Sequence, residues 1–293
     1  MSGSDGDGTG AGLGSNQWQG GLGQKWAQHL EALEAQWVAA KALGLGALSP
    51  RPRERVLDIG CGGARTTRAI AEAVGAEGRV LGLDISPELV AIANDGLADL
   101  DHASVLLADA STHGFDAGGW DAVFSRFGVM FFEDPPGAFR NIHAALKPRA
   151  RAVFVVHADR KGSAWASLPA GIAAEVLGPA EPTPPGAAGP FGWESPEIFV
   201  PILEAGGFGD IAWETHPVTG PMGLGLGSDP VAGALEMVRG IGVVARRLGE
   251  LDEAEAALAW EEIARRLAPA LSPYVEDGAV RIGGNLHVIT ARA

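Results

Sequence analysis

Apolar positions along the chain alternate between the spacing of strands and the spacing of helices. Short apolar runs predict strands, and apolar residues three or four positions apart predict amphipathic helices. After residue 50, this pattern predicts strands at 55–59, 79–84, 103–108, 121–125 and 150–157, and helices at 64–74, from 86 onward and at 136–146. Ser86, Pro87 and Glu88 supply the N-cap, the first-turn proline and the early acidic residue of the second helix. The alternation predicts an α/β fold with a Rossmann-like, doubly wound, mostly parallel sheet.

Further elements are predicted on both sides of this core. Trp26, Leu30, Leu33 and Trp37 recur at helical spacing and predict one amphipathic helix over 24–43. Beyond the core we predict a helix at 195–205, a strand at 210–216, helices at 230–248 and 252–267, and a last strand at 285–291. The two added strands bring the predicted sheet to seven.

The composition divides the chain into successive parts. Gly, Pro and Ala dominate between the fifth strand and the helix that begins at residue 195, which favours a loop there. We expect a disordered tail (1–15), an N-terminal helical cap segment (16–50), a ligand-binding Rossmann-like core (51–158), a mobile lid loop (159–194), a continuation of the core (195–217), a helical cap insertion (218–275) and the last strand of the core (276–293).

Composition limits the class of protein. With 293 residues and 46% hydrophobic content, the chain is long enough to bury a large core. Runs of about 18 apolar residues and a signal-peptide pattern are both missing from the sequence, which favours a cytoplasmic protein. Cys61 is the single cysteine, so an intramolecular disulfide and a cysteine metal cluster are excluded, and no metal is predicted.

Charge bears on the expected partners. The formal net charge of −14 opposes binding to nucleic acids and to anionic membranes. A neutral or cationic small molecule remains compatible with it, and so does the plainer view that acidity serves solubility. The sequence leaves open whether the protein is a monomer or a homodimer.

The turn after the first strand carries the clearest chemical signal. Asp58-Ile59-Gly60-Cys61-Gly62 places a carboxylate and two glycines between a strand and a helix, where backbone can approach a ligand. A nicotinamide fingerprint requires a third glycine at the position of Arg65 and usually an apolar residue at that of Asp58. The carboxylate therefore favours a ligand with a cationic group over a pyrophosphate.

This stretch resembles motif I of the class I S-adenosylmethionine-dependent methyltransferases, with Ala64 in place of a common third glycine. The resemblance implies that Asp58, Gly60, Cys61 and Gly62 hold the amino-acid part of the cofactor S-adenosyl-L-methionine, whose product is S-adenosyl-L-homocysteine. The strand ends that follow fit the same family. Asp84 with Ile85 is expected at the ribose, and Asp109 with Ala110 at the adenine.

The fourth predicted strand narrows the resemblance. Residues 121–132, followed by Glu133-Asp134-Pro135, resemble the ubiquinone- and menaquinone-biosynthesis-like methyltransferases. The likeness covers about residues 50 to 158 well and the remainder loosely. It implies cofactor contacts from Ser125, Arg126 and Phe127, with Arg126 facing the substrate.

Candidate catalytic and acceptor-binding residues lie in and around this core. His157 ends the fifth strand and is the favoured general base if the acceptor needs one, with Arg126 and His113 as further catalytic candidates. Each histidine also has a plain structural interpretation. Aromatic side chains outside the core suit a planar or cationic acceptor. The predicted acceptor wall comprises Trp18, Trp26, His29, Met130, Trp165 and Trp193.

The sequence therefore predicts a methyltransferase that modifies the O, N or C atom of a small molecule, in natural-product tailoring. Three alternatives stay open. The first is a protein of the same fold that binds the cofactor for other chemistry, the second an NAD(P)-dependent reductase, and the third a non-enzymatic protein on a degenerate core.

Overall fold

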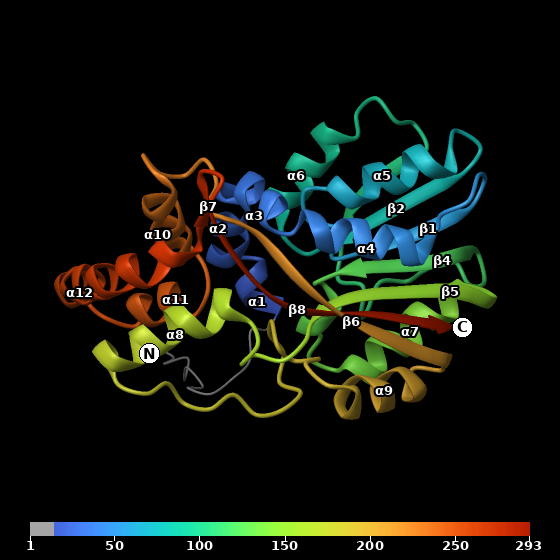
Figure 1. Cartoon of the computed structure of the whole chain (residues 1–293). Helices are drawn as coiled ribbons and strands as arrows, with labels where there is room; N and C mark the ends of the chain where they lie inside the picture. The colour runs from blue at the N-terminus through green and yellow to red at the C-terminus, as the bar shows by residue number, and fades with distance from the viewer. Residues whose placement is uncertain (1–14) are drawn as a thin grey trace, which may run out of the picture.

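The computed structural model describes residues 15–293 and confirms the predicted α/β architecture (Figure 1). The expected disordered tail falls almost entirely outside the described residues. One eight-stranded sheet has the order β3-β2-β1-β4-β5-β8-β6, with β7 paired to β8. The strands are β1 (Arg55–Ile59), β2 (Arg79–Asp84), β3 (Ala103–Leu107), β4 (Trp120–Arg126), β5 (Leu146–His157), β6 (Gly209–Met222), β7 (Val275–Glu276) and β8 (Ala279–Arg292). The predicted seven strands are all present, and the two-residue β7 is the addition.

Helices cover both faces of the sheet, as a parallel sheet requires. They are α1 (Ser15–Trp18), α2 (Gly21–Gln28), α3 (Leu30–Gln36), α4 (Val38–Leu48), α5 (Arg65–Val74), α6 (Pro87–Gly96), α7 (Pro135–Ala145), α8 (Ala164–Leu177), α9 (Pro196–Ala205), α10 (Pro230–Gly240), α11 (Val243–Gly249) and α12 (Glu253–Leu271), with 3-10 turns at Val129–Phe131 and Ser272–Tyr274. Helices α4, α5 and α6 lie on one face, and α7 and α9 lie on the other (Figure 1).

Two neighbouring residues of β1 show that the sheet lies between two layers of helices. Val56 packs with α5, while Leu57 belongs to the cluster around α7 and α9. Because successive side chains of a strand point to opposite faces, both faces must be apolar to be covered. Among the strands of residues 15–293, β8 alone runs in the opposite direction, and it pairs antiparallel with β5, β6 and β7. Parallel strands thus end together at one edge of the sheet.

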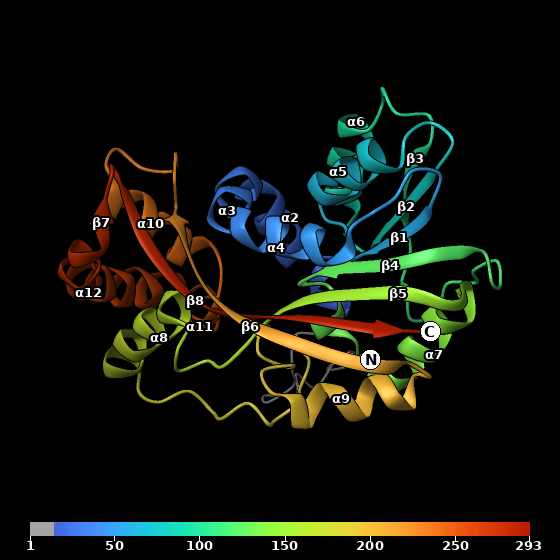
Figure 2. The same cartoon turned by 45° about the vertical axis from the view of Figure 1, so that its right-hand side comes forward.

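Strands β6 and β8 form a ribbon that outgrows the sheet. Each has 14 residues, and they stay paired from Gly209 opposite Arg292 to Met222 opposite Val280. Strand β6 can contain Pro217, which lacks a backbone N–H, because it is an edge strand and needs hydrogen bonds on one side only. The far half of the ribbon carries α10, α11 and α12, and α8 packs against this group (Figure 2).

The structure differs from the sequence prediction in three regions. The single helix expected over 24–43 is broken at His29 and Trp37 into α2, α3 and α4. The loop expected at 159–194 contains α8, whose apolar residues pack on the cap. The helix expected at 230–248 is likewise two helices, interrupted at Gly242, where φ is 94°.

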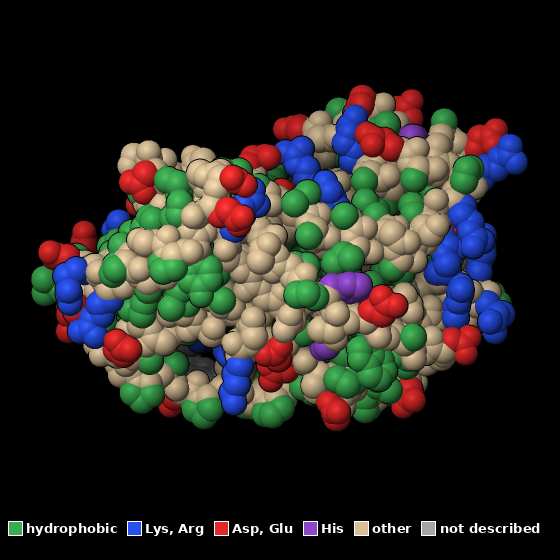
Figure 3. All heavy atoms as spheres, in the orientation of Figure 1, with side chains coloured by type: hydrophobic (Ala, Val, Ile, Leu, Met, Phe, Trp, Pro, Cys, Tyr) green, Lys and Arg blue, Asp and Glu red, His purple; other side chains and the backbone are tan. Residues whose placement is uncertain are grey.

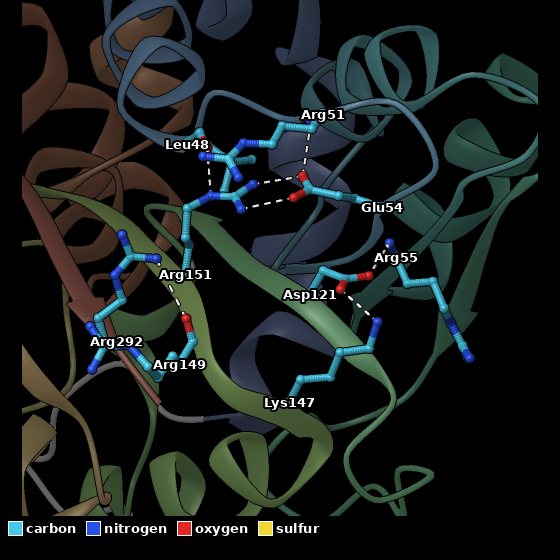
Figure 4. A network of polar contacts seen from close by, with 9 residues as sticks. All are labelled: Leu48, Arg51, Glu54, Arg55, Asp121, Lys147, Arg149, Arg151 and Arg292. Atoms are coloured by element: carbon cyan, nitrogen blue, oxygen red, sulfur yellow. Dashed lines mark hydrogen bonds and ion pairs between the residues drawn. The ribbon is translucent and has the colours of Figure 1, made fainter.

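A polar network holds the opposite edge of the sheet, where the parallel strands begin (Figure 4). Arg151 of β5 makes two hydrogen bonds to the Glu54 carboxylate, at 2.8 and 2.6 Å, and Lys147 reaches Asp121 of β4 at 2.6 Å. These contacts join the segment before β1 to β4 and β5. This edge is therefore structural, and the strand ends across the sheet are free to line a site.

No helix among residues 15–293 has the length and apolar character needed to span a bilayer.

Candidate functional site

A cavity of about 1140 Å³ lies at the edge where the parallel strands end. The ends of β1, β2, β4 and β5 form its floor, and segments 17–37, 160–194 and 237–250 supply wall residues around it. The molecular surface is hollowed beside α8 and the segment after it, with basic side chains near the opening (Figure 3). The cavity thus joins the sheet to the cap.

The turn after β1 is held in a conformation that few residues adopt. Gly60 and Gly62 have φ values of 66° and 54°, and a Cβ on Gly60 would come within 2.7 Å of the Gly128 Cα. The amides of Gly60 and Cys61 both donate to the Leu83 carbonyl, at 2.8 and 3.1 Å. A Cβ on Gly62 would meet only open space. The turn is therefore pinned to β2 and presents bare backbone to the cavity.

Asp84 is anchored at the end of β2. Its Oδ2 accepts a hydrogen bond from the Gly62 amide at 2.8 Å, and its Oδ1 accepts one from the Ser86 amide at 2.9 Å. Burial raises its pKa, although these amides act in the opposite direction. The carboxylate lines the cavity, and a carboxylate oxygen can accept more than one hydrogen bond. Two adjacent hydroxyl groups of a ligand suit its two oxygens.

Asp109 follows β3 and is fixed in a similar way. Its Oδ1 accepts hydrogen bonds from the backbone amide and the hydroxyl of Ser111, at 2.8 and 2.7 Å. Asp109, Ala110 and Ile85 all lie on the cavity wall, where the sequence predicted cofactor contacts. The cavity therefore brings together the second and third strand ends.

Asp58 is placed differently from the prediction. It lies beneath the cavity wall, and its Oδ2 accepts the Thr67 hydroxyl hydrogen bond at 2.7 Å. Burial raises its pKa to about 6, opposed by Thr67 and the nearby charge of Arg126. Its carboxylate thus supports the turn after β1 from below, whereas Gly60, Cys61 and Gly62 line the cavity.

Ser125 is likewise buried beneath the wall. Its hydroxyl donates to the Ile59 carbonyl at 2.7 Å and accepts from the Gly128 amide at 3.3 Å. These bonds tie the end of β1 to the end of β4. The predicted direct contact of Ser125 with the cofactor is therefore corrected to support of the turn.

Arg126 and Phe127 do reach the cavity. The Arg126 guanidinium forms an ion pair with Glu34 of α3, and both side chains line the wall. Phe127 has φ of 66°, an uncommon value for a residue with a Cβ. Its ring stacks on His157, with centroids 4.3 Å apart and planes 8° apart. Backbone strain at this point accompanies a defined side-chain arrangement.

Five rings from distant parts of the chain enclose the inner cavity. We call this group the aromatic chamber, and it consists of Trp37, Phe127, His157, Trp165 and Phe191. Trp37 meets His157 edge-on at 4.8 Å, Trp165 lies 4.9 Å from His157, and Phe191 stacks on Trp165 at 5.8 Å. All five rings line the cavity. The chamber presents mostly apolar surface.

His157 is the titratable member of the chamber. Its Nδ1 is buried and has no hydrogen-bond partner among the described residues. Burial lowers its pKa to about 3, so the imidazole is neutral near pH 7. A group of this kind can exchange a hydrogen bond with a ligand, but desolvation opposes its taking up a full proton.

The other predicted contacts divide into two groups. Trp18, Trp26 and Met130 line the cavity, beside the chamber. His29 and His113 lie away from its wall: His29 Nδ1 bonds the Lys25 carbonyl at 2.7 Å, and His113 packs on Phe115. The structure brings neither histidine to the site.

Trp193 is a further correction. It is 1% exposed and packs between Phe139 and Phe199 in the core beneath the sheet, away from the cavity. Phe191, two residues earlier, faces the chamber instead. Phe191 and Glu34 are cavity residues that were missed, because the sequence gives no signal of which face either presents.

Within the described residues, no three His, Cys, Asp or Glu side chains lie together as metal ligands would.

Comparison with known proteins finds a family model and several relatives that are similar to the core. Residues 56–149 match the family model described as "Methyltransferase domain". Aklanonic acid methyltransferase DauC of Streptomyces sp. (strain C5) is 35% identical over 116 residues, which cover 39% of this chain and 53% of DauC. Demethylmenaquinone methyltransferase of Staphylococcus epidermidis is 35% identical over 94 residues, covering 32% of this chain and 39% of that protein. The matches thus span about half of these relatives or less.

A solved structure extends the likeness to almost the whole fold. The [4+2]-cyclase SpnF superposes with a TM-score of 0.57 at 17% identity, covering 96% of this chain and 97% of SpnF. At this identity the likeness concerns the fold alone. Residues 56–149 are thus similar to methyltransferase domains, in agreement with the resemblance to the class I, S-adenosylmethionine-dependent methyltransferases of the ubiquinone- and menaquinone-biosynthesis-like group.

Proposed function

We propose that the protein transfers a methyl group from S-adenosylmethionine to a small-molecule acceptor. The observation that carries this proposal is the single cavity that joins the anchored carboxylate of Asp84 to the aromatic chamber. Pockets for one small ligand usually measure about 300–1,000 Å³. A volume of about 1140 Å³ leaves room for a cofactor at the strand ends and a second molecule beside it.

The residues at the strand ends fit the cofactor. Asp84 offers two fixed oxygens to a ribose diol, and Asp109 keeps Oδ2 available beside a bonded Oδ1. The open space at Gly62 admits a chain close to the backbone. Carboxylates at this end also favour a molecule that carries positive charge. We assign the ribose to Asp84, the adenine to Asp109 and the amino-acid part to residues 60–62.

The chain's own contribution to the reaction is placement and exclusion of water. When bound, S-adenosylmethionine supplies a methyl group already activated on a sulfonium. Alignment of donor and acceptor can then provide much of the rate, because a bimolecular encounter becomes local. Segment 179–192 and the cap helices α10 and α11 border the cavity and limit the access of water.

His157 has a positioning role in this proposal. It stands neutral among four aromatic rings, with burial lowering its pKa to about 3. A hydrogen bond from a hydroxyl to a neutral imidazole orients the acceptor without forming an imidazolium. Full proton transfer to His157 would need an added negative charge nearby, for example an ionised acceptor.

The acceptor itself is proposed to be aromatic and largely apolar. The chamber offers ring faces and edges to a planar molecule. The names of the relatives, which include a demethylmenaquinone and an aklanonic acid methyltransferase, fit this chemistry. A role in natural-product tailoring follows as part of the same proposal.

A turnover assay tests the function. We would incubate the protein with S-adenosylmethionine and a panel of aromatic phenols, amines and β-dicarbonyl compounds, and measure S-adenosylhomocysteine and methylated product by mass spectrometry. The proposal expects the two products in equal amounts and only with an acceptor present. An acceptor that is altered without S-adenosylhomocysteine formation would instead indicate cofactor-bound chemistry of another kind. Binding of NADH in place of S-adenosylhomocysteine would revive the reductase alternative.

A further inference from the structure

The pair formed by Arg126 and Glu34 is enclosed in the cavity wall. Their side chains are only 13% and 17% exposed. Helix α3 makes a second ion pair to the core, between Glu31 and Arg65, but there the side chains are 77% and 42% exposed and lie away from the cavity. One helix therefore makes two pairs to the same domain, one inside the cavity and one outside.

Arg126 also differs from the other basic residues on the described cavity wall. Arg160, Lys161 and Arg246 are exposed to solvent. Arg247 is held by the carbonyls at the end of α8, at 2.7 and 2.9 Å. Arg126 is thus the cation that sits deep beside the chamber with a carboxylate as its partner.

The position of Arg126 connects this charge to the chamber. It ends β4 and precedes Phe127, whose ring stacks on His157. A molecule that places a ring in the chamber can therefore bring a substituent toward the guanidinium. Glu34, in contrast, belongs to α3, which has seven residues and is bounded by the backbone breaks at His29 and Trp37.

We propose that Glu34 holds the place of an acceptor oxyanion, and that a carboxylate or an ionised phenol of the acceptor replaces it on Arg126. This inference rests on the proposed function, because it requires the chamber to be the acceptor site. An arginine left buried without a partner is costly, so a resident carboxylate keeps the empty site stable. A planar oxyanion can then take over charge-assisted hydrogen bonds of the same kind. The acceptor class is an aromatic acid or an acidic phenol.

If an acceptor oxyanion replaces Glu34 on Arg126, substitutions of Glu34 and of Arg126 should change anion affinity in opposite directions. We would titrate the protein calorimetrically with naphthoate, with picrate as a phenolate ionised at neutral pH, and with naphthalenemethanol as the uncharged probe. Glu34→Gln removes the competing charge and is expected to tighten binding of the anions roughly tenfold while leaving the alcohol unchanged. Arg126→Gln is expected to weaken binding of the anions by a similar factor. Arg126→Lys is expected to restore part of that affinity.

Glu31→Gln is the matched control, since it breaks the exposed pair of the same helix. It should bind all three probes as the unaltered protein does. Anion affinity that is unchanged or reduced in Glu34→Gln would overturn the proposal and leave the pair as an anchor of α3. Equal tightening in Glu31→Gln would overturn it too, because loosening of the helix would then explain the effect.

Two further readouts separate the possible failures. Tightening of naphthoate alone identifies a carboxylate acceptor, and tightening of picrate alone identifies a phenolate. S-adenosylhomocysteine is titrated into the same samples, whose folding is checked by circular dichroism. If S-adenosylhomocysteine binds but no variant changes anion affinity, the proposed role of Glu34 is overturned and the proposed function stands. If S-adenosylhomocysteine does not bind to the unaltered protein, the proposed function itself is contradicted.

Discussion

The two ends of the cavity are built in different ways. At the strand ends, Asp84 is fixed by amides only two residues and 22 residues away, within the part that matches the family model. At the cap end, the aromatic chamber joins rings from the junction of α3 and α4, from the residue after β4, from the end of β5 and from segment 165–191. Local turns therefore determine the first end, whereas tertiary packing determines the second. Under the proposed function, a substitution in the chamber should therefore leave the strand-end site intact.

The largest expected effect concerns a tryptophan that belongs to neither end. Trp193→Ala should lower the free energy of unfolding by about 3–5 kcal/mol, because it empties a large volume in the core. Affinity of the folded fraction for S-adenosylhomocysteine should not change. Urea denaturation measures the loss, with Trp213→Ala as a control in which a partly exposed ring is removed and the loss is smaller. Undiminished stability of Trp193→Ala would show that this ring is no part of the core.

The next effect tests the strand-end site. Asp84→Ala should weaken S-adenosylhomocysteine binding by about 2–3 kcal/mol, as charge-assisted hydrogen bonds to the ribose are lost. Isothermal titration measures the change. Asp101→Ala removes an exposed carboxylate just before β3 and serves as the control. Equal affinities in Asp84→Ala and the control would refute the ribose assignment.

The third prediction concerns pH at the cap end. The folded state holds the pKa of His157 at about 3, against an ordinary value of 6.5. Below pH 6.5, His157 therefore takes up a proton in the unfolded chain but stays neutral in the folded chain. Proton binding favours the unfolded state, so the free energy of unfolding falls as pH falls from 6.5 toward 3. Relative to His157→Phe, the unaltered protein should lose about 1.5 kcal/mol between pH 6.5 and pH 5.

Urea denaturation of both proteins at several pH values measures this difference. The raised pKa of Asp58, about 6, has the opposite sign, since the folded chain gains that proton first and is favoured as pH falls from 6 toward 3.8. Asp58 is present in both proteins and its effect cancels. Parallel stability curves for the two proteins would show that His157 is not held neutral.

The smallest effect is expected for the exposed pair of α3. Glu31→Gln should change the free energy of unfolding by less than about 1 kcal/mol, because both partners of the pair are exposed to solvent. Glu34→Gln breaks the enclosed pair and should lower the free energy of unfolding by more than Glu31→Gln does. Thermal unfolding of the two variants gives the comparison. A larger loss in Glu31→Gln would mean that the exposed pair is what holds α3 on the core.

Much of the strand-end site could be predicted because its signals are local. A glycine turn after a buried strand and a carboxylate at the end of the next strand are both visible in a few adjacent letters. Even here, sequence did not separate Asp84 from Asp58. Asp84 is the last residue of β2 and Asp58 the last but one of β1, but the hydroxyl of Thr67 on α5 holds the Asp58 carboxylate below the wall.

The cap end could not be predicted to the same degree because contacts between residues far apart in the sequence determine which side chains face the cavity. Trp165 and Trp193 lie in similar Gly- and Pro-rich surroundings, yet one faces the chamber and the other meets Phe139 of α7. Helix α8 was not predicted because it includes Pro169 and precedes the Gly- and Pro-rich stretch at 178–190. Contact with α11 and α12 supplies the stabilisation that its sequence does not indicate.

One titration tests the central claim that a single cavity has a cofactor end and a separate acceptor end. S-adenosylhomocysteine would be titrated calorimetrically into the unaltered protein, Asp84→Ala and Trp165→Ala, all shown to be folded. The account predicts binding to the unaltered protein, a loss of about 2–3 kcal/mol in Asp84→Ala and near-unchanged affinity in Trp165→Ala. Absence of binding to the unaltered protein, or an equal loss in the two variants, would contradict it.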